Sequence, residues 1–233
     1  MENWCPEITS LLDKADLPYT FTKNNTLIIS NRVTLHHDLY CQSPSKVLSR
    51  IQSICGLNKQ RIFARKTLVK MVKRAEAISF LNQHHLMGYG GGKTYLGLYY
   101  RDKLVALAVF SKVLYMKYED PPYHSVELER YCSISGITVV GGLDKLIKAY
   151  LKNTTVDDIV TYVDKEWSNG SSYLQLGFEV TAETEPLCFL VNSNSWTRTP
   201  VNKDFSSKEL SDNEYLVSNK GNLKLRFTIP KPV

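Results

Sequence analysis

The sequence has no long apolar run. Its longest uninterrupted stretch of apolar side chains, Leu104–Phe110, has the length of a strand, whereas a membrane-spanning helix needs about 20 such residues. The first residues include Glu7 and Asp13 and lack the basic start and apolar centre of a secretory signal. We therefore expect a cytoplasmic protein without a membrane span.

Closely spaced cysteines are also missing. The five cysteines are scattered and form no Cys-x-x-Cys pair, which argues against a disulfide framework or a zinc ribbon and for reduced thiols. The histidines occur as His36-His37, His84-His85 and His124. Adjacent residues on a strand face opposite sides, and on a helix they are about 100° apart, so neither pair forms a natural metal clamp. We predict no metal site from these residues.

Acidic residues are absent from residues 59–74, which contain seven lysines and arginines in a chain of net charge +6. A basic run of this kind suits a polyanion, either a nucleic acid or the phosphates of coenzyme A. The alternative is a solvated face of a strand and a helix. The candidate nucleic-acid-binding residues are Arg61, Arg65, Lys66, Lys70, Lys73 and Lys93.

The pattern of apolar residues predicts an α+β protein with a small N-terminal appendage. Residues 1–58 are the appendage, residues 59–192 form an α+β domain, and residues 193–233 form a C-terminal extension with a hairpin of 215–218 and 223–229. In the appendage we expect helices at 6–15 and 44–55 and a hairpin at 26–35. In the domain we expect strands at 62–72, 95–100, 104–114, 125–133 and 159–164, and helices from 74 and at 142–152.

Two glycine-rich segments could bind anions. Gly88–Thr94 resembles a phosphate-binding loop, but a strand follows it where such a loop must lead into a helix. We expect it to be a mobile loop near the acceptor site. Val140, Gly141 and Gly142 lie between a strand and a helix, where backbone N–H groups and the helix dipole can hold a phosphate.

Charged residues alternate along the strand at 125–133. Period-two alternation puts Val126, Leu128 and Arg130 on one face, and Glu127, Glu129 and Tyr131 on the other. A carboxylate there can act as a general base towards an amine, and Arg130 can hold an anion through two hydrogen bonds. The alternative for the carboxylates is an exposed strand face with cross-strand ion pairs.

Residues 159–178 read as a buried strand that ends at Asp164 and a short helix that ends at Gly177, with Ser168 or Asn169 as its cap. The pattern Asn169-Gly-x-x-Tyr173-x-x-x-Gly177-Phe178 resembles the last helix and strand of the GNAT superfamily of N-acetyltransferases. That resemblance implies a mixed, splayed central sheet flanked by helices, and Tyr173 as the group that protonates the leaving thiolate.

The same resemblance implies an acetyl-CoA or other acyl-CoA donor, held by Val140, Gly141, Gly142, Ser168 and Asn169. The family's loop reads Arg/Gln-x-x-Gly-x-Gly/Ala. This chain has Gly136-Ile-Thr-Val-Val-Gly-Gly142 instead, which leaves an aminoacyl donor or an iron-assisted modification as alternatives.

From about Arg61 onwards, the order of several segments resembles phage and mobile-element proteins labelled Hef-like homing endonucleases, and is similar to the Mom family of phage DNA-modification proteins. The matching residues include Arg61-Ile-Phe-Ala-Arg-Lys66, Phe80-Leu-Asn82, Glu127-Leu128 with Arg130, and Trp167-Ser168. The family's nuclease part is missing, since residues 1–60 contain no Glu-x-Lys. The resemblance implies transfer of an acyl-type group to an amine of a nucleic-acid base.

For this activity we predict the catalytic residues Asp164, Tyr173, Arg130, Glu127 and His85. We expect Asp164 and Tyr173 to face one cleft, because ligands collect at the carboxyl ends of strands in open sheets. A noncatalytic nucleic-acid-binding module and an acetyltransferase that acts on a small-molecule amine are the alternatives.

Overall fold

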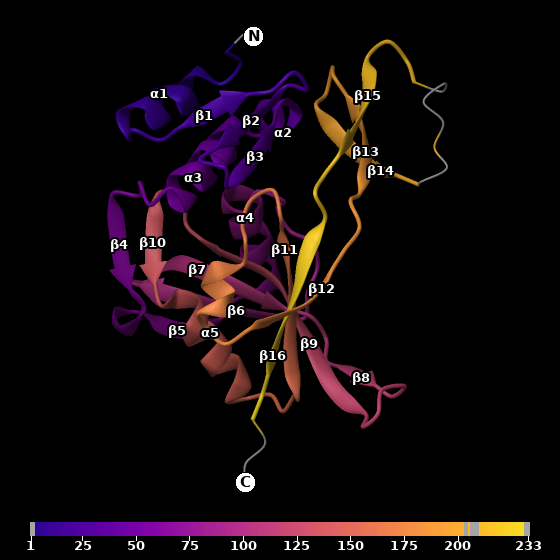
Figure 1. Cartoon of the computed structure of the whole chain (residues 1–233). Coiled ribbons are helices and arrows are strands. Elements are labelled where there is room, and N and C mark those ends of the chain that lie inside the picture. The colour runs from indigo at the N-terminus through magenta and orange to yellow at the C-terminus, as the bar shows by residue number, and fades with distance from the viewer. Residues whose placement is uncertain (1–2, 203–204, 206–209, 231–233) are drawn as a thin grey trace. The chain divides into compact units, whose positions relative to one another are not determined.

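The computed structural model describes residues 3–202, 205 and 210–230 (Figure 1). The helices are α1 (Pro6–Lys14), α2 (His37–Gln42), α3 (Pro44–Ile54), α4 (Arg74–His84), α5 (Gly142–Leu151) and α6 (Ser171–Leu174), with one 3-10 turn, η1 (Ala64–Lys66). The strands are β1 (Tyr19–Phe21), β2 (Thr26–Ile29), β3 (Val33–His36), β4 (Gln60–Phe63), β5 (Leu68–Met71), β6 (Thr94–Tyr100), β7 (Lys103–Phe110), β8 (Leu114–Met116), β9 (Tyr123–Ser133), β10 (Ile137–Val140), β11 (Asp158–Asp164), β12 (Glu179–Glu183), β13 (Cys188–Asn192), β14 (Thr197–Val201), β15 (Glu214–Ser218) and β16 (Asn222–Thr228). None of these helices has the length and hydropathy of a membrane-spanning segment.

The contacts divide the chain into two compact units, which we describe separately. The first unit comprises residues 1–48, 162–171 and 180–224, and the second comprises residues 49–161, 172–179 and 225–233. This grouping differs from the three predicted segments, because residues of the predicted appendage and of the C-terminal extension belong to one unit. Part of the extension, residues 203–204, 206–209 and 231–233, lies outside the described residues.

An eight-stranded sheet is the largest element of the structure, with β12-β16-β11-β9-β7-β6-β5 in order and β8 added to β9. The pairs β5–β6, β6–β7 and β7–β9 are antiparallel, while β11 runs parallel to β9. The predicted α+β architecture with a mixed central sheet flanked by helices is therefore confirmed. The tight β6–β7 turn has Arg101 and Asp102 at φ 50° and 59°, as two-residue hairpins require.

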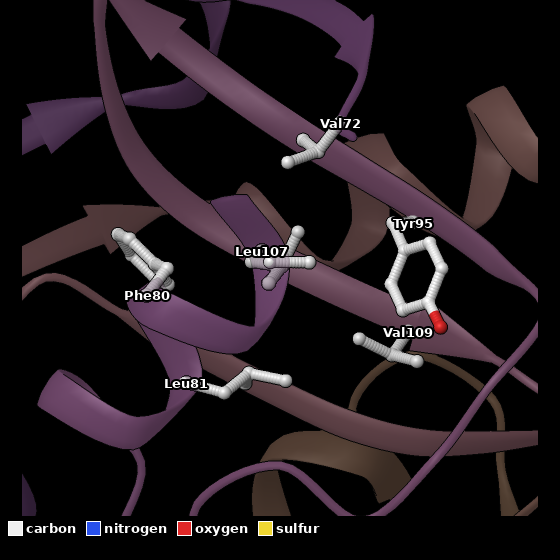
Figure 2. Close-up of a cluster of buried hydrophobic side chains, with 7 residues drawn as sticks. Val72, Phe80, Leu81, Tyr95, Leu107 and Val109 are labelled. Carbon is white, nitrogen blue, oxygen red and sulfur yellow. The ribbon is translucent and has the colours of Figure 1, made fainter. Parts of the chain in front are cut away.

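Helices α4 and α5 cover opposite faces of this sheet. Side chains of α4 pack on the face that carries Tyr95, Leu107 and Val109 (Figure 2). On the other face, Phe110 of β7 stacks on Tyr150 of α5 with ring centroids 4.0 Å apart. Because neighbouring residues of a strand face opposite ways, Val109 and Phe110 assign the two helices to different faces.

Strands β9 and β11 separate after a short paired stretch. Their parallel ladder contains only the pairs Asp158–Ser125, Ile159–Val126 and Val160–Glu127, although β9 continues to Ser133. At the first unpaired position the side-chain hydroxyl of Thr161 donates to the carbonyl oxygen of Leu128 at 2.9 Å. This gap is the predicted splay of the central sheet.

The prediction of one strand at 62–72 is wrong, because this segment forms two strands, β4 and β5, separated by the 3-10 turn η1. The turn is closed by the Thr67 hydroxyl, which donates to the carbonyl oxygen of Ala64 at 2.7 Å. β4 leaves the main sheet and pairs in parallel with β10. Gly141 and Gly142 consequently lie between strand β10 and the start of α5, as predicted.

The predicted appendage helices and the hairpin around Ser30 and Asn31 are confirmed. The predicted C-terminal hairpin is wrong, because β15 pairs with β13 and β16 joins the eight-stranded sheet. Gly221 lies so close to Thr184 that a Cβ atom there would be 2.2 Å from the Thr184 carbonyl oxygen. The next residue, Asn222, donates through its N–H to the Thr184 hydroxyl at 2.8 Å, which holds β16 beside β12.

Candidate active site

A β-bulge in β9 defines the candidate site. Val109 of β7 pairs with Arg130, and the next residue, Phe110, pairs with Leu128, so Glu129 is an extra residue on β9. The bulge reverses the alternation, so that Leu128 and Arg130 lie on opposite faces. The predicted grouping of Leu128 with Arg130 on one face is therefore wrong.

Both charged residues at the bulge contact the glycine-rich loop that precedes β6. A Cβ atom on Gly90 would lie 2.4 Å from a terminal guanidinium nitrogen of Arg130, and one on Gly91 would lie 3.4 Å from Glu129 Oε2. Arg130 also donates to the carbonyl oxygens of Gly88 at 3.3 Å and of Glu129 at 2.7 Å. The glycine-rich loop therefore lies directly on β9.

The carboxyl groups here hold their protons more tightly than free carboxyl groups do. Burial raises the pKa of Glu129, the charge of Glu127 raises it further, and Arg130 opposes the shift. Burial also raises the pKa of Glu127, whose N–H donates to the Ser111 hydroxyl at 3.0 Å. A carboxylate with a raised pKa is better matched to proton transfer near neutral pH.

Tyrosines line the gap between β9 and β11 from the α5 face. Tyr131 pairs across the sheet with Ala108, and a Cβ atom on Gly142 would lie 2.7 Å from its hydroxyl oxygen. Burial raises the pKa of Tyr131 to about 12, with the nearby Tyr173 adding to the shift. Burial likewise raises the pKa of Tyr173, and a hydrogen bond with Thr161 opposes it. Both phenols therefore stay protonated at neutral pH.

A cleft of about 940 Å³ lies between α5 and the β4–η1–β5 segment. Its wall is fixed by Lys145, whose ammonium group donates to the carbonyl oxygens of Ala64 at 2.8 Å and Thr67 at 2.5 Å. Two of the predicted cofactor residues, Val140 and Gly141, line the cleft together with Arg65. Gly141 has φ 74° and no side chain caps α5, so this helix start and Arg65 fit the phosphate part of an acyl-CoA.

The other predicted site residues are divided between the two units. Asp164, Ser168 and Asn169 belong to the first unit, whereas Tyr173 belongs to the second, as the bulge does. The side chains of Ser168 and Asn169 accept the N–H groups of Gly170 at 3.1 Å and Ser171 at 3.2 Å, so they shape the turn before α6. The imidazole Nδ1 of His85 accepts the Met87 N–H at 3.2 Å, which shapes the start of the glycine-rich loop.

Asp164 lies in a charged cluster of the first unit. Burial raises its pKa, and Glu166 adds to this effect, while the Glu166 N–H, Arg198 and His36 oppose it. Glu166 is itself buried and lies 2.7 Å from the imidazole Nε2 of His36. The cluster includes a further ion pair between Arg198 and Asp38, which is only 1% exposed.

The predicted nucleic-acid-binding residues are all exposed. Arg61, Arg65, Lys66, Lys70, Lys73 and Lys93 lie on β4, η1, β5 and the segments before α4 and β6. Arg65 lies over the ring of Phe63, 4.9 Å from its centroid. Lys70 faces Asp102 at 3.7 Å, where both side chains are solvated. A solvated ion pair of this kind adds little to stability. Most of the positive charge of these six residues is therefore free to attract a polyanion.

The sequence matches no protein-family model and no curated protein. The solved structures to which the chain is similar include acetyltransferases. A Bacillus subtilis acetyltransferase in complex with CoA matches 71% of this chain and 100% of its own at 13% identity and a TM-score of 0.43. The ribosomal-protein-S18-alanine N-acetyltransferase of Escherichia coli matches 72% of this chain and 96% of its own, at 13% identity and a TM-score of 0.43. A GNAT family acetyltransferase of Elizabethkingia anophelis with acetyl-CoA bound matches 70% of this chain and 99% of its own, at 11% identity and a TM-score of 0.42.

These similarities concern the course of the chain only. They give no support to the resemblance to Hef-like or Mom proteins, which stays a prediction. Among the described residues, no group of three or more His, Cys, Asp or Glu side chains is placed to hold a metal ion, so iron receives no support either.

The role of several residues in the site could not be predicted from the sequence. No pattern predicts a bulge at Glu129, and Tyr131 has the pattern of an ordinary strand residue. Tyr89, Tyr95 and Arg74 are joined by hydrogen bonds around the glycine-rich loop. The only signal that could have pointed to them is the loop itself.

Proposed function

We propose that this protein transfers an acyl group from a thioester donor to an amine. The observation that carries the proposal is the bulge in β9, which brings Glu129 and Arg130 against the glycine-rich loop next to the gap between β9 and β11. Tyr131 and Tyr173 lie at the same gap, with pKa values raised by burial. A base and a proton donor thus flank one opening in the sheet.

Each residue has a defined task in this proposal. The Glu129 carboxylate accepts a proton from the attacking amine, and Arg130 holds the loop that borders the amine. The protonated Tyr173 hydroxyl donates to the leaving thiolate. Gly141 and Gly142 at the start of α5, with Arg65, would hold the donor's phosphates, and a bound acyl-CoA would supply the activated carbonyl.

We further propose that the acceptor amine is carried by a nucleic acid. The support is the acid-free basic run at residues 59–74. Its lysine and arginine side chains are exposed, and Lys70 is the one with an ion pair among the described residues. Such a surface attracts phosphates without reading sequence.

Nucleoside mass spectrometry tests both statements. Purified protein is incubated with acetyl-CoA and with DNA, RNA or a small primary amine, and each product is analysed for an acyl adduct. The proposal expects an adduct on a base and none with Glu129→Gln. An adduct only on the small amine would retain acyl transfer and overturn the nucleic-acid acceptor. No adduct on any acceptor would overturn the enzyme.

Donor binding is tested separately by calorimetric titration with acetyl-CoA. A dissociation constant tighter than about 0.1 mM, or roughly 5.5 kcal/mol of binding free energy, supports the donor. We expect Arg65→Gln to weaken acetyl-CoA binding, and Lys46→Gln, at a residue that does not line the cleft, to leave it unchanged. Absence of heat at millimolar acetyl-CoA would overturn this donor.

A noncatalytic nucleic-acid-binding module is the second candidate, favoured by the same exposed basic run. Replacing Arg61, Lys66 and Lys73 by Gln should weaken binding equally for unrelated sequences. The dependence of log affinity on log salt should flatten by about 0.9 for each duplex phosphate that the variant no longer neutralises. Unchanged affinity and slope would mean that the run is only a solvated face.

A further inference from the structure

A lysine of α5 holds the turn that carries Arg65, and the transfer described above gives this lysine no task. The ammonium group of Lys145 donates to the carbonyl oxygens of Ala64 at 2.8 Å and of Thr67 at 2.5 Å. These carbonyl groups mark the two ends of η1, because Ala64 begins the turn and Thr67 directly follows it. Lys145 therefore spans the turn from end to end, with Arg65 between the two bonds.

The turn is also closed by bonds of its own. The hydroxyl and the N–H of Thr67 both donate to the carbonyl oxygen of Ala64, at 2.7 Å and 3.0 Å. Both residues are buried, with 6% of Ala64 and 3% of Thr67 exposed. A buried carbonyl group that loses its donor is destabilising, so Lys145 and Thr67 together hold η1 in one conformation.

The same lysine connects the turn to the start of its own helix. The Lys145 N–H donates to the carbonyl oxygen of Gly141 at 3.1 Å, and a Cβ atom on Gly141 would lie 3.8 Å from the Ala64 Cβ, at ordinary contact distance. Strands β4 and β10 lie side by side (Figure 1), with Phe63 paired to Val140. Turn η1 and the start of α5 thus line the cleft as one connected piece.

Arg65 is the charged side chain that the turn presents to the cleft. It is exposed and lines the cleft, and its guanidinium lies 4.9 Å from the centroid of the Phe63 ring, which lines the cleft as well. Two lysines of the lining are already engaged, Lys145 by the carbonyl oxygens and Lys148 by Asp144 at 2.8 Å. Because a guanidinium binds phosphate through a rigid fork of donors, affinity for a phosphate should depend on where η1 holds Arg65.

We propose that Lys145 is a positioning residue for the acyl-CoA donor, which holds η1 so that Arg65 can contact the donor's phosphates. This inference rests on the proposed acyl transfer and its donor. The segment Gly136–Gly142 lacks the Arg or Gln of the usual GNAT loop, and the cation in its place comes from η1, far earlier in the chain. If η1 is released, Arg65 keeps its charge and loses its fixed place, so that donor binding must also order the turn.

The hold on η1 is measured first, without any ligand. Hydrogen exchange of peptides covering residues 64–71 is followed by mass spectrometry in the wild type, Lys145→Met, Thr67→Val and Lys148→Met. Thr67→Val removes a hydroxyl from the turn and changes no charge. Lys148→Met is the matched control, since it removes the same charge from the same helix and leaves the bonds of η1 intact. We expect faster exchange in Lys145→Met and Thr67→Val only, and wild-type exchange in Lys145→Met would overturn the inference.

Donor binding is then measured by calorimetric titration of the same proteins with acetyl-CoA. We expect Lys145→Met to raise the dissociation constant about tenfold, the lower end of what a hydrogen bond from a charged group contributes. Thr67→Val should raise it by a smaller factor, about threefold, because its hydrogen bond is neutral. Lys148→Met should raise it by less than Lys145→Met does, and equal effects of the two lysine variants would overturn the inference.

The decisive comparison adds these changes to Arg65→Gln. If Lys145 acts through Arg65, then Lys145→Met and Thr67→Val should weaken acetyl-CoA binding little further in the Arg65→Gln background, whereas Lys148→Met should keep its full effect. Full additivity of Lys145→Met with Arg65→Gln would mean that Lys145 contributes only charge or stability, and would overturn the inference. If Lys145→Met does not fold, the same cycle with Thr67→Val decides.

Two outcomes separate this inference from the function on which it rests. Absence of acetyl-CoA binding by the wild type would overturn the donor and the positioning role together. Binding by the wild type that Arg65→Gln leaves unchanged would keep the donor and overturn the positioning role alone.

Discussion

Gly92 is the residue at which the loop can be tested most directly. Its φ is 116°, and a Cβ atom would lie 2.2 Å from a methyl carbon of the buried Val109. In Gly92→Ala the backbone strain costs about 1–3 kcal/mol, and overpacking against a core side chain costs typically 1–3 kcal/mol. The expected loss of unfolding free energy is therefore roughly 2–5 kcal/mol after the smaller gain from a stiffer unfolded chain.

The matched control is Gly136→Ala. Gly136 also has a positive φ, 78°, but nothing lies within 4 Å of its Cβ position, so this variant keeps the strain and lacks the overlap. Urea unfolding followed by circular dichroism gives both values, provided that the slope against urea is unchanged. We expect Gly92→Ala to be less stable than Gly136→Ala by about 1–3 kcal/mol. Equal stabilities would refute the close packing of the loop on β7.

Three further changes have expected outcomes. Tyr173→Phe should reduce transfer with little change in melting temperature, whereas unfolding of this variant would make Tyr173 structural. The raised pKa of Asp164 means that folding favours its neutral form. Asp164→Asn should therefore be at least as stable as the wild type at pH 7. The difference in unfolding free energy between the two should vanish below the unfolded pKa of about 3.9, as unfolding curves at low pH would show. Arg198→Met leaves the Asp38 carboxylate buried without its partner and should lower the unfolding free energy by about 3–5 kcal/mol. Lys165→Gln, which breaks the exposed pair with Glu183, should lower it by about 0–1 kcal/mol. Similar losses for the two variants would contradict the buried ion pair between Arg198 and Asp38.

Elements with a strong local pattern were predictable. The stripe Leu143, Leu146, Ile147 and Tyr150 predicts α5, and all four side chains are buried in it. The β6–β7 hairpin follows from a short polar turn between two apolar runs. In these cases the interactions that select the structure join residues a few positions apart.

The candidate site was predicted only in part. Arg130 and the glycine-rich loop were recognised by residue type, but their contact was not. The bulge at Glu129 is a shift in the pairing register between β9 and β7. The alternation of residues along β9 alone does not predict it. The position of Gly141 and Gly142 between a strand and a helix was predicted, but the pairing of Ile137–Val140 with β4, far away in the sequence, was not.

The sequence by itself determined the α+β class, most helices and strands, the two glycine-rich segments and the acid-free basic run, because these depend on side chains close together along the chain. Only the tertiary structure decided the strand pairings, the bulge, and the meeting of Arg74, Tyr89, Tyr95 and Glu129. Those four residues come from a helix, a loop and two strands. Their contacts form only when β9 docks on β7 and α4 packs over the sheet, so the site around the glycine-rich loop depends on packing that local sequence does not encode.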